Sequence, residues 1–343
     1  MPGFVDCHTH LIFGGSREDE FIEKIKGKSY LEILEKGGGI LNTVEKTRKE
    51  LQSPEKLLKK ILKVLKKMLL WGTTTAEVKS GYGLDKNSEI LIPELVKKLN
   101  NLQPIELIPT FLGAHAFPKE YQGKKDEYVN LVIEILSEIK TRNLAEYCDV
   151  FCEKGAFSIR DTTKILEKAK SLGMKLKLHA NQFNNIGAVE LGERFGAVSL
   201  DHLDYISDAE IKRMAKQKII GVLLPGVQFH LGISHFAPAR TMIEEGVPIA
   251  LASDFNPGSC PTFSMQMIIA LACRMMKMTP AEAINASTIN AAHAVNKADE
   301  IGNLEIGKKA DIIILDIANH ERLPYWFGMN LVETVIKKGR IVK

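Results

Sequence analysis

The chain has 343 residues, a length that suits one α/β barrel with a small appended unit. Hydrophobic residues make up 45% and charged residues 26%, which are ordinary values for a globular protein and exclude wholesale disorder. The formal net charge is only +4, and the lysines are spread over predicted helix faces rather than gathered in one block. This distribution argues against nucleic acid as the main partner.

Three features of the sequence bear on where in the cell the protein is located. No apolar run reaches the roughly 18 residues that a membrane span requires. No signal-peptide pattern precedes the first predicted strand, because Asp6 arrives almost at once. The five cysteines are odd in number and form no CxxC pair. We therefore expect a reduced, cytoplasmic protein with no membrane partner.

The first predicted element is a short apolar strand, 4–10, that ends in the pair His8 and His10. In a strand, residues i and i+2 point to the same side, with their Cα atoms roughly 6.6 Å apart. The two imidazoles can then bind one metal ion. A lone His-x-His also fits an ordinary strand end or a surface pair, so this hypothesis depends on partners elsewhere in the chain.

Helical patterns follow at intervals. The clearest is 53–71, where Ser53 can cap the helix, Pro54 suits its first position and apolar residues repeat at helical spacing. Further helices are predicted over 158–172, from Ser207 (with Glu210 at capping-box spacing), over 263–276, and over 279–294 (with Thr279 and Glu282 at the same spacing).

Strand-like runs alternate with these helices. They cover 4–10, 72–79, 105–116, 147–157, 175–179, 197–202, 219–224 and 248–254. Eight β/α units are the number for a parallel barrel, although a doubly wound sheet also alternates strands and helices.

The polar residues at the strand ends decide between these two folds. They are His8, His10, His115, His179, His202 and Asp254, at the C-terminal ends of five different strands. In a (β/α)8 barrel these ends converge on one mouth, where the chemistry is done. We therefore predict an α/β protein with a (β/α)8 TIM barrel over 1–300, followed by a β-strand tail over 301–343. The tail strands are predicted at 312–316 and 333–342, and the second contains a turn at Lys338 and Gly339.

Two histidines of the first strand, one of the fifth and an aspartate of the eighth make a site of three nitrogens and one oxygen. Such a site suits Zn²⁺ or Fe²⁺, with one position left open for water. A divalent ion lowers the pKa of that water from near 16 towards about 7 and generates hydroxide at neutral pH. Asp254 can take the water's proton and deliver it to a leaving nitrogen. His115 and His202 can donate hydrogen bonds to a developing oxyanion, so the pattern predicts hydrolysis of a C–N bond.

Nine stretches of the chain carry a resemblance to a known family. They are PGFVDCHTHLIFGGSR, GTTTAEVKSGYGLD, TFLGAHA, FCEKGAFS, KLHANQ, SLDHLD, LLPG, ALASDFNPGSCPTFSM and GNLEIGKKADIIILD, and they run from residue 2 to about residue 316. The sequence resembles the amidohydrolase superfamily and, within it, the imidazolonepropionase family. The His-x-His and tail motifs indicate only the superfamily, whereas VKSGYGLD, FLGAHA and SDFNPGS together are specific to the family.

The resemblance implies an activity and a set of site residues. The implied reaction is 4-imidazolone-5-propanoate plus water giving N-formimidoyl-L-glutamate, a step of histidine degradation. The implied ligands of one Zn²⁺ or Fe³⁺ ion are His8, His10, His179 and Asp254. The implied substrate contacts are Arg17 to the propionate, Tyr82 in the pocket wall, His115 to the imidazolone, Gln182 and His202 to the ring and the attacking water, and Asn256, Gly258 and Ser259 to the product. The implied catalytic residues are Asp254, His202, His115 and Gln182, and relatives suggest a homodimer.

The chain departs from the family pattern in two places. Relatives carry a further stretch before the first barrel strand that pairs with the tail strands, so we expect the tail to lack its usual partners. An incomplete gene product, a late start codon and a shorter domain are all compatible with this difference, and unpaired edges promote aggregation. Asn181 stands where relatives often have an acidic residue, and we expect it to face away from the substrate.

Lys177 is the residue with the least certain role. It shares parity with His179 on the fifth strand and should point inward, toward a negative partner lower in the barrel unless the strand is bulged. A carboxylated lysine that bridges two metals is disfavoured, since in binuclear relatives it lies on the fourth strand, and we expect one metal.

Two other functions remain open. A purine or pyrimidine deaminase of the same superfamily would have little use for Arg17. A catalytically silent barrel is expected to have lost at least one of the four implied ligands, and all four are present. In each enzymatic alternative the partner is a small molecule.

Overall fold

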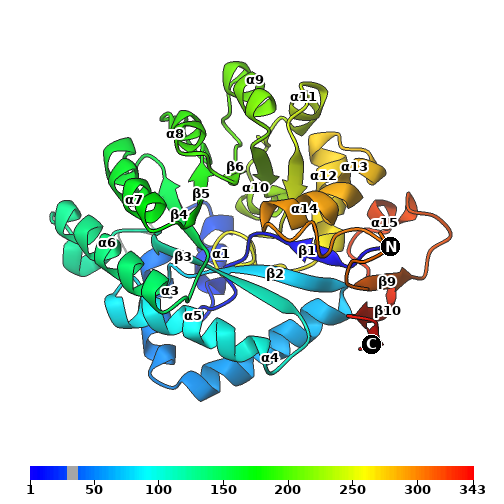
Figure 1. Cartoon of the computed structure of the whole chain (residues 1–343), viewed down its shortest axis with the longest axis horizontal. Coiled ribbons are helices and arrows are strands. Elements are labelled where there is room, and N and C mark those ends of the chain that lie inside the picture. Colours follow the sequence, from blue (N-terminus) through cyan, green and yellow to red (C-terminus); the bar gives the residue numbers. More distant parts are fainter. Residues whose placement is uncertain (29–37) are drawn as a thin grey trace.

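The computed structural model describes residues 1–28 and 38–343. Eight parallel strands form one sheet in the order β1 to β8, surrounded by helices (Figure 1). The strands are β1 (Phe4–Asp6), β2 (Thr73–Lys79), β3 (Glu106–Ala114), β4 (Tyr147–Cys152), β5 (Lys175–Ala180), β6 (Ser199–His202), β7 (Ile220–Leu223) and β8 (Ile249–Leu251). A doubly wound sheet would reverse its strand order near the middle, so the sequential order confirms the predicted barrel.

The barrel closes just beyond the ends of its first and last strands. Asp254 N–H donates to the His8 carbonyl at 2.9 Å, and His10 N–H donates to the Phe255 carbonyl at 3.0 Å. Thr9 and Phe255 form a parallel bridge between these bonds. Seven of the eight regular strands are shorter than predicted, and β5 is one residue longer. The residues that follow β1 and β8 complete the ring of backbone hydrogen bonds.

The helices cover the outside of the barrel. They are α1 (Glu18–Ile25), α3 (Ile40–Leu51), α4 (Pro54–Leu70), α5 (Lys86–Asn100), α6 (Lys125–Thr141), α7 (Ile159–Ser171), α8 (Ala188–Phe195), α9 (Asp208–Gln217), α10 (Pro225–Leu231), α11 (Ala239–Glu244), α12 (Met265–Met276), α13 (Pro280–Ala286) and α14 (Ile289–Ala294), with a 3₁₀ turn at Lys119–Tyr121. Each long helix buries one apolar stripe; in α4 the stripe includes Leu57, Ile61, Leu65 and Met68. None of the helices in the described ranges has the length and apolar content needed to cross a membrane.

Local capping chemistry sets several helix starts. The capping boxes predicted at Ser207 and Thr279 are both present and open α9 and α13. Pro54 begins α4 as expected, but the Ser53 side chain makes no capping hydrogen bond, so that part of the prediction is wrong.

The helix predicted over 279–294 is two helices, α13 and α14, that meet at Ser287 and Thr288. The Ser287 carbonyl accepts a hydrogen bond from Val5 N–H at 3.0 Å. The Thr288 hydroxyl donates to the Ile284 carbonyl at 2.7 Å. The contact with β1 and the side-chain bond compete with a continuous helix, which explains the break.

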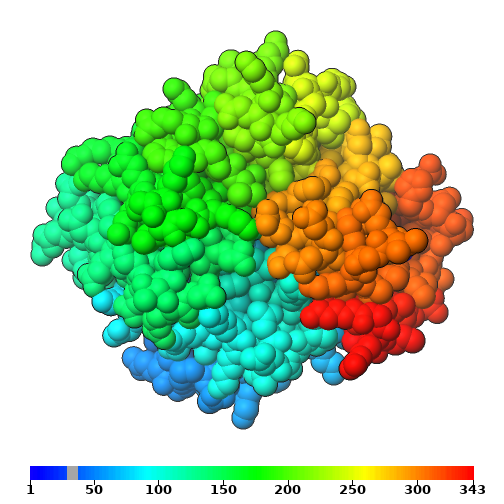
Figure 2. Space-filling view, in the orientation of Figure 1, coloured from blue at the N-terminus to red at the C-terminus, as the bar shows by residue number. Residues whose placement is uncertain are grey.

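The tail forms a separate antiparallel sheet on one side of the molecule (Figure 2). Its elements are β9 (Ile312–Leu315), α15 (Arg322–Tyr325), β10 (Val332–Lys337) and β11 (Arg340–Ile341). Lys338 and Gly339 have φ of 50° and 77°, typical of the tight turn in a hairpin, so the turn predicted within 333–342 is confirmed and joins β10 to β11. The N-terminal amine donates to the Ile313 carbonyl at 3.0 Å. The tail strands thus bond to one another and to the first residues of the chain.

Candidate metal and substrate site

Four side chains from distant parts of the chain meet at the C-terminal mouth of the barrel. His8 and His10 follow β1, His179 lies near the end of β5, and Asp254 follows β8. His8 Nε2 lies 3.3 Å from His10 Nε2 and 3.4 Å from Asp254 Oδ1, and His10 Nε2 lies 3.2 Å from the same oxygen. Ligands about 2.0–2.1 Å from a tetrahedral zinc ion are about 3.3 Å apart, so these three atoms already match the edges of a zinc tetrahedron.

The nitrogens of His179, His115 and His202 lie around this triad. His8, His179 and His202 hold ligand atoms within 4.8 Å of one another, and so do His10, His115 and His179. Asp254 Oδ1 and both ring nitrogens of His179 and of His202 are buried and have no hydrogen-bond partner among the described residues, although His179 Nδ1 lies 3.1 Å from the Asp149 carboxylate. Buried polar atoms normally have partners, so this donor set fits a bound cation. Which four residues bind it stays a prediction.

Burial and charge favour the ligand forms of His10, His202 and Asp254. Burial lowers the pKa of His10 to about 4 and lowers the pKa of His202 well below its ordinary value. Burial alone raises the pKa of Asp254, but its contacts with His10 and His8 hold that pKa well below the ordinary range. Neutral imidazole and ionised carboxylate are the forms that bind metals.

Strained backbone occurs at three of the same strand ends. His202 has φ of 80°, and Asn181 and Asp254 each have φ of 52°. This left-handed region costs roughly 1–3 kcal/mol for a residue with a side chain and occurs most often at functional sites. Asn181 is buried and directs its amide toward Glu210 at 3.4 Å, away from the ligand cluster, as expected.

A cavity of about 50 Å³ opens beside the ligand cluster. Its lining includes the predicted contacts Tyr82, His115, Gln182, His202, Asn256 and Ser259, together with His10, His179, Asp254 and Phe151. The sequence analysis did not single out Phe151, although its parity with Asp149 on β4 places it inside the barrel. The volume is close to that of one or two water molecules, so a larger substrate requires the lining side chains to move apart.

Arg17 and Gly258 are not among the residues that line this cavity; Arg17 packs against the loop after β8, whose Asn256 and Ser259 do line it. Arg17 Nε and Nη2 donate to Glu20 Oε2 at 2.9 and 2.8 Å. Glu20 Oε1 in turn accepts from Gly39 N–H and from the Asn42 amide, both at 3.1 Å. On its other side the guanidinium packs against Gly258, where an added Cβ would lie 1.9 Å from Arg17 Nη1. Arg17 thus occupies space that only glycine at position 258 leaves free.

The loop after β8 is shaped by the side chain of Asn256. Its Oδ1 accepts from Gly258 N–H and Ser259 N–H at 2.8 Å each, and its Nδ2 donates to the Asp254 carbonyl at 2.7 Å. The Ser259 hydroxyl donates to Asp254 Oδ2 at 3.4 Å. The Asn256 side-chain amide therefore forms most of its hydrogen bonds within the loop that positions Asp254 at the cavity.

His115 has a defined tautomer. Its Nδ1 lies 3.0 Å from the Gly81 carbonyl, which can only accept, so Nδ1 carries the proton. Burial lowers the pKa of His115 well below its ordinary value, so the ring is neutral and Nε2 is an acceptor. The ring stacks on His10 with centroids 4.8 Å apart. This geometry differs from the donor role expected from the sequence and instead suits an N–H group of a ligand.

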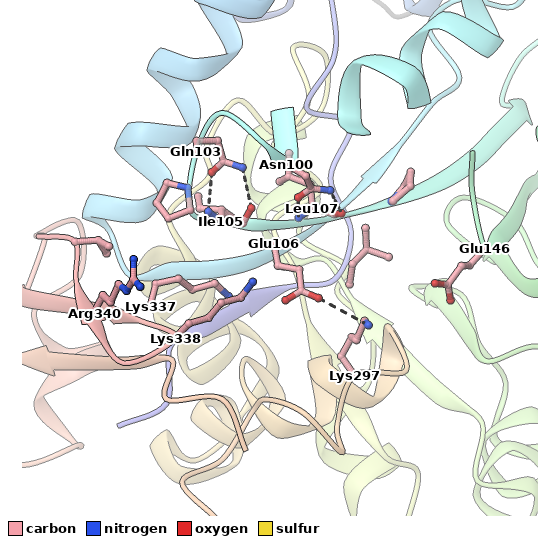
Figure 3. Close-up of a pocket in the computed structure, with 14 residues that line it drawn as sticks. Asn100, Gln103, Ile105, Glu106, Leu107, Glu146, Lys297, Lys337, Lys338 and Arg340 are labelled. Atoms are coloured by element: carbon pink, nitrogen blue, oxygen red, sulfur yellow. Dashed lines mark hydrogen bonds and ion pairs between the residues drawn. The ribbon is translucent and has the colours of Figure 1, made fainter. Parts of the chain in front are cut away.

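A larger cavity of about 740 Å³ lies at the opposite end of the barrel (Figure 3). It is lined by the start of β3 around Glu106, by Glu146, and by the tail residues Lys337, Lys338 and Arg340. The chemistry of TIM barrels takes place at the C-terminal ends of the strands, and this cavity lies at the N-terminal ends. Two of its lysines are also paired: Lys297 contacts Glu300 at 2.9 Å, and Lys337 contacts Asp311 at 2.6 Å.

The fold and the ligand cluster together indicate a barrel hydrolase, and the comparison with known families agrees. Residues 1–342 match the model of the amidohydrolase family, and the chain belongs to this family. Its relatives include "Imidazolonepropionase" from Alkaliphilus oremlandii, 49% identical over 99% of this chain and 81% of the relative. The protein of the same name from Fusobacterium nucleatum is 49% identical over 99% of this chain and 82% of the relative. The resemblance inferred from the motifs is thereby confirmed.

Solved structures share the fold at lower identity. Guanine deaminase from E. coli superposes with a TM-score of 0.74 at 16% identity, covering 100% of this chain and 83% of its own. A zinc-bound adenosine deaminase from Xanthomonas campestris superposes with a TM-score of 0.67 at 19% identity, covering 99% of this chain and 79% of its own. At this identity the likeness concerns the fold alone.

Proposed function

We propose that this protein is an imidazolonepropionase, which hydrolyses a cyclic amide C–N bond of 4-imidazolone-5-propanoate to give N-formimidoyl-L-glutamate. The observation that carries the proposal is the cluster of His8, His10 and Asp254, with ligand atoms 3.2–3.4 Å apart, beside the cation of Arg17. Relatives of that name at 47–49% identity over 99% of the chain support the same reaction.

We propose Zn²⁺ as the resident ion, held by His8, His10, His179 and Asp254, with Fe³⁺ as the alternative that metal analysis distinguishes. The nitrogen-rich donor set and the near-tetrahedral spacing favour zinc. A divalent ion there lowers the pKa of a bound water from near 16 to about 7.

The protein's own groups handle the protons and the substrate. Asp254 is ionised and faces both the ligand cluster and the cavity, so it takes a proton from the attacking water and returns it to the leaving ring nitrogen. His202, whose ring nitrogens have no partner in the described part of the chain, donates a hydrogen bond to the ring carbonyl oxygen. His115 accepts from a ring N–H through Nε2, and the amide of Gln182, which lines the same cavity, orients the ring.

Arg17 supplies the selectivity for an anionic side chain. Its guanidinium can bind the propionate through two parallel hydrogen bonds, the geometry in which arginine binds carboxylates best. A base deaminase, the alternative from the same superfamily, acts on uncharged rings and gives Arg17 no role. The presence of Arg17 and the names of the similar relatives therefore both favour an imidazolonepropionase over a base deaminase.

The test is the loss of ultraviolet absorbance of 4-imidazolone-5-propanoate when purified, zinc-loaded protein is added. The propionamide analogue, which lacks the negative charge, and a panel of adenine, guanine and cytosine serve as comparison substrates. We expect turnover of the anionic substrate, much weaker turnover of the amide and none of the bases. A folded, metal-loaded protein that leaves the imidazolone intact, or that deaminates a base, contradicts the proposal.

Gly258→Ala is expected to raise the KM for the anionic substrate about tenfold while kcat stays within about threefold of the parent. The new Cβ would overlap the Arg17 guanidinium and displace it. We expect the displaced guanidinium to lose roughly one charge-assisted hydrogen bond to the propionate of the substrate. Steady-state kinetics on both substrates check this, since the KM for the propionamide should change little. An equal rise for both substrates would show that the methyl group blocks the pocket as a whole.

We further propose a cytoplasmic homodimer with a barrel over 1–300 and a tail unit over 301–343. All five cysteines are free, which suits a reducing compartment. Light scattering on the purified protein measures the number of subunits directly.

A further inference from the structure

A layer of buried charge lies inside the barrel beneath the ligand cluster. It consists of Glu77 and Lys79 on β2, Asp149 on β4, Lys177 on β5 and Asp201 on β6, all fully buried. Branched apolar residues normally fill this space in a TIM barrel, and a buried charge is costly unless it is paired. Three carboxylates and two ammonium groups leave one negative charge in the layer. The prediction that Lys177 finds a negative partner is confirmed, since it contacts Glu77 at 2.7 Å.

Lys79 is the centre of this layer. Its Nζ lies 2.6 Å from Asp149 Oδ2, 3.3 Å from Asp201 Oδ2 and 3.3 Å from Glu77 Oε1. These three carboxylates, from three different strands, match the three donors of one ammonium group.

The two aspartates also contact two of the predicted metal ligands, through the same oxygens. Asp201 Oδ2 lies 2.7 Å from His8 Nδ1, and Asp149 Oδ2 lies 3.1 Å from His179 Nδ1. A carboxylate at Nδ1 keeps the proton on that nitrogen and leaves the lone pair on Nε2 free for a metal. Each shared oxygen therefore joins Lys79 to a ligand histidine.

We propose that Lys79 is a positioning residue of the metal site, which through Asp149 and Asp201 fixes the orientation of both His179 and His8. One ammonium group thereby couples two ligands that come from opposite parts of the barrel. The inference rests on the metal site of the proposed function and does not depend on the identity of the substrate.

Comparison with His10 and Lys177 shows that the link between Lys79 and the ligand histidines is specific to these residues. His10 has no such link, since its carboxylate contact, to Asp254 at 3.2 Å, is made through Nε2 and not through Nδ1. Lys177 is as deeply buried as Lys79, but its hydrogen bonds go to Glu77 and, at 3.5 Å, to the Cys7 carbonyl. Lys177→Met therefore removes the same charge from the same layer without touching either aspartate, and is the matched control for Lys79→Met.

The experiment measures Co²⁺ binding at fixed pH, by competition with a chromophoric chelator and by the visible absorption of the tetrahedral ion. Removing a positive charge near the site should by itself strengthen the attraction for a cation. Loss of positioning acts in the opposite direction and typically weakens metal binding about 10–100-fold. We therefore expect Lys79→Met to bind Co²⁺ about 10–100-fold more weakly than the parent, with an altered visible spectrum, while Lys177→Met binds at least as tightly as the parent.

Unchanged or tighter binding by Lys79→Met, or an equal loss in both variants, overturns the inference. If circular dichroism shows that Lys79→Met does not fold, Lys79→Gln, which removes the ammonium group but keeps a polar end in the layer and leaves both aspartates in place, is measured instead, with the same expectation and the same overturning results. A folded parent that binds no Co²⁺ refutes the proposed metal site, and the inference with it. A parent that binds Co²⁺ but turns over no imidazolone refutes only the substrate.

Discussion

Asp254→Asn is expected to lower kcat for 4-imidazolone-5-propanoate by at least about 10³-fold. An amide cannot accept the proton of the attacking water, and loss of a general base alone typically costs about 10²–10⁴-fold. The exchange also removes a negative charge that lies 3.2 Å from His10 Nε2 and 3.4 Å from His8 Nε2, so weaker metal binding adds to the loss. The measurement is the decay of substrate absorbance under saturating metal and substrate.

The control for this variant is Asp204→Asn, which makes the same exchange at a buried aspartate outside the ligand cluster. It should keep most of the parent activity. Metal content and circular dichroism are measured on both variants. If a folded, metal-loaded Asp254→Asn protein retained a tenth of the parent kcat, Asp254 would not be the base.

Arg17→Gln is expected to raise the KM for the anionic substrate about 100-fold, which corresponds to about 3 kcal/mol, and to lower kcat much less. Two effects contribute to this loss. The bidentate contact with the propionate disappears, and Glu20, which loses its partner at 2.8 Å, leaves an uncompensated negative charge beside the pocket. Steady-state kinetics are measured with the propionate and with the propionamide. Loss of charge recognition raises the KM for the propionate alone, whereas a distorted pocket raises the KM for both substrates.

The double variant Arg17→Gln/Glu20→Gln isolates the second effect. It should recover part of the KM lost in Arg17→Gln, because the repelling carboxylate is removed. The KM of Arg17→Lys should lie between those of the parent and Arg17→Gln, because lysine keeps the positive charge but lacks the two parallel N–H donors of the guanidinium. Equal KM values for all variants would place the propionate elsewhere.

Sequence patterns predict well which residues gather at the mouth of this barrel, because each of them can be recognised locally as a polar residue at the end of a strand. His8, His10, His179 and Asp254 each stand at or just after a strand end, and a parallel barrel brings all such ends together. The same rule of alternation placed Lys177 on the inner face of β5, below His179.

Contacts that depend on closure of the barrel were not predictable in this way. Lys79, Asp149 and Asp201 lie on β2, β4 and β6, and nothing local in those strands indicates that one ammonium group reaches both aspartates. The break between α13 and α14 has the same origin, since it follows a hydrogen bond from distant Val5. The tautomer of His115 depends on the Gly81 carbonyl, another partner that sequence spacing does not reveal.

The seam between the first and last strands has a consequence for how the protein acquires its activity. Asp6 and Ser253 lie 247 positions apart in the chain, yet the Ser253 N–H donates to the Asp6 carboxylate at 2.9 Å. Contacts of such sequence separation form late and slowly during folding, because the chain must first pay the entropy of closing a very long loop. His8 and Asp254 lie on the two sides of this seam, so a partly folded chain whose last β/α unit has not docked holds no complete ligand set. During synthesis the site can therefore assemble only after nearly three quarters of the chain has left the ribosome, and enzymatic activity reports the final step of ring closure.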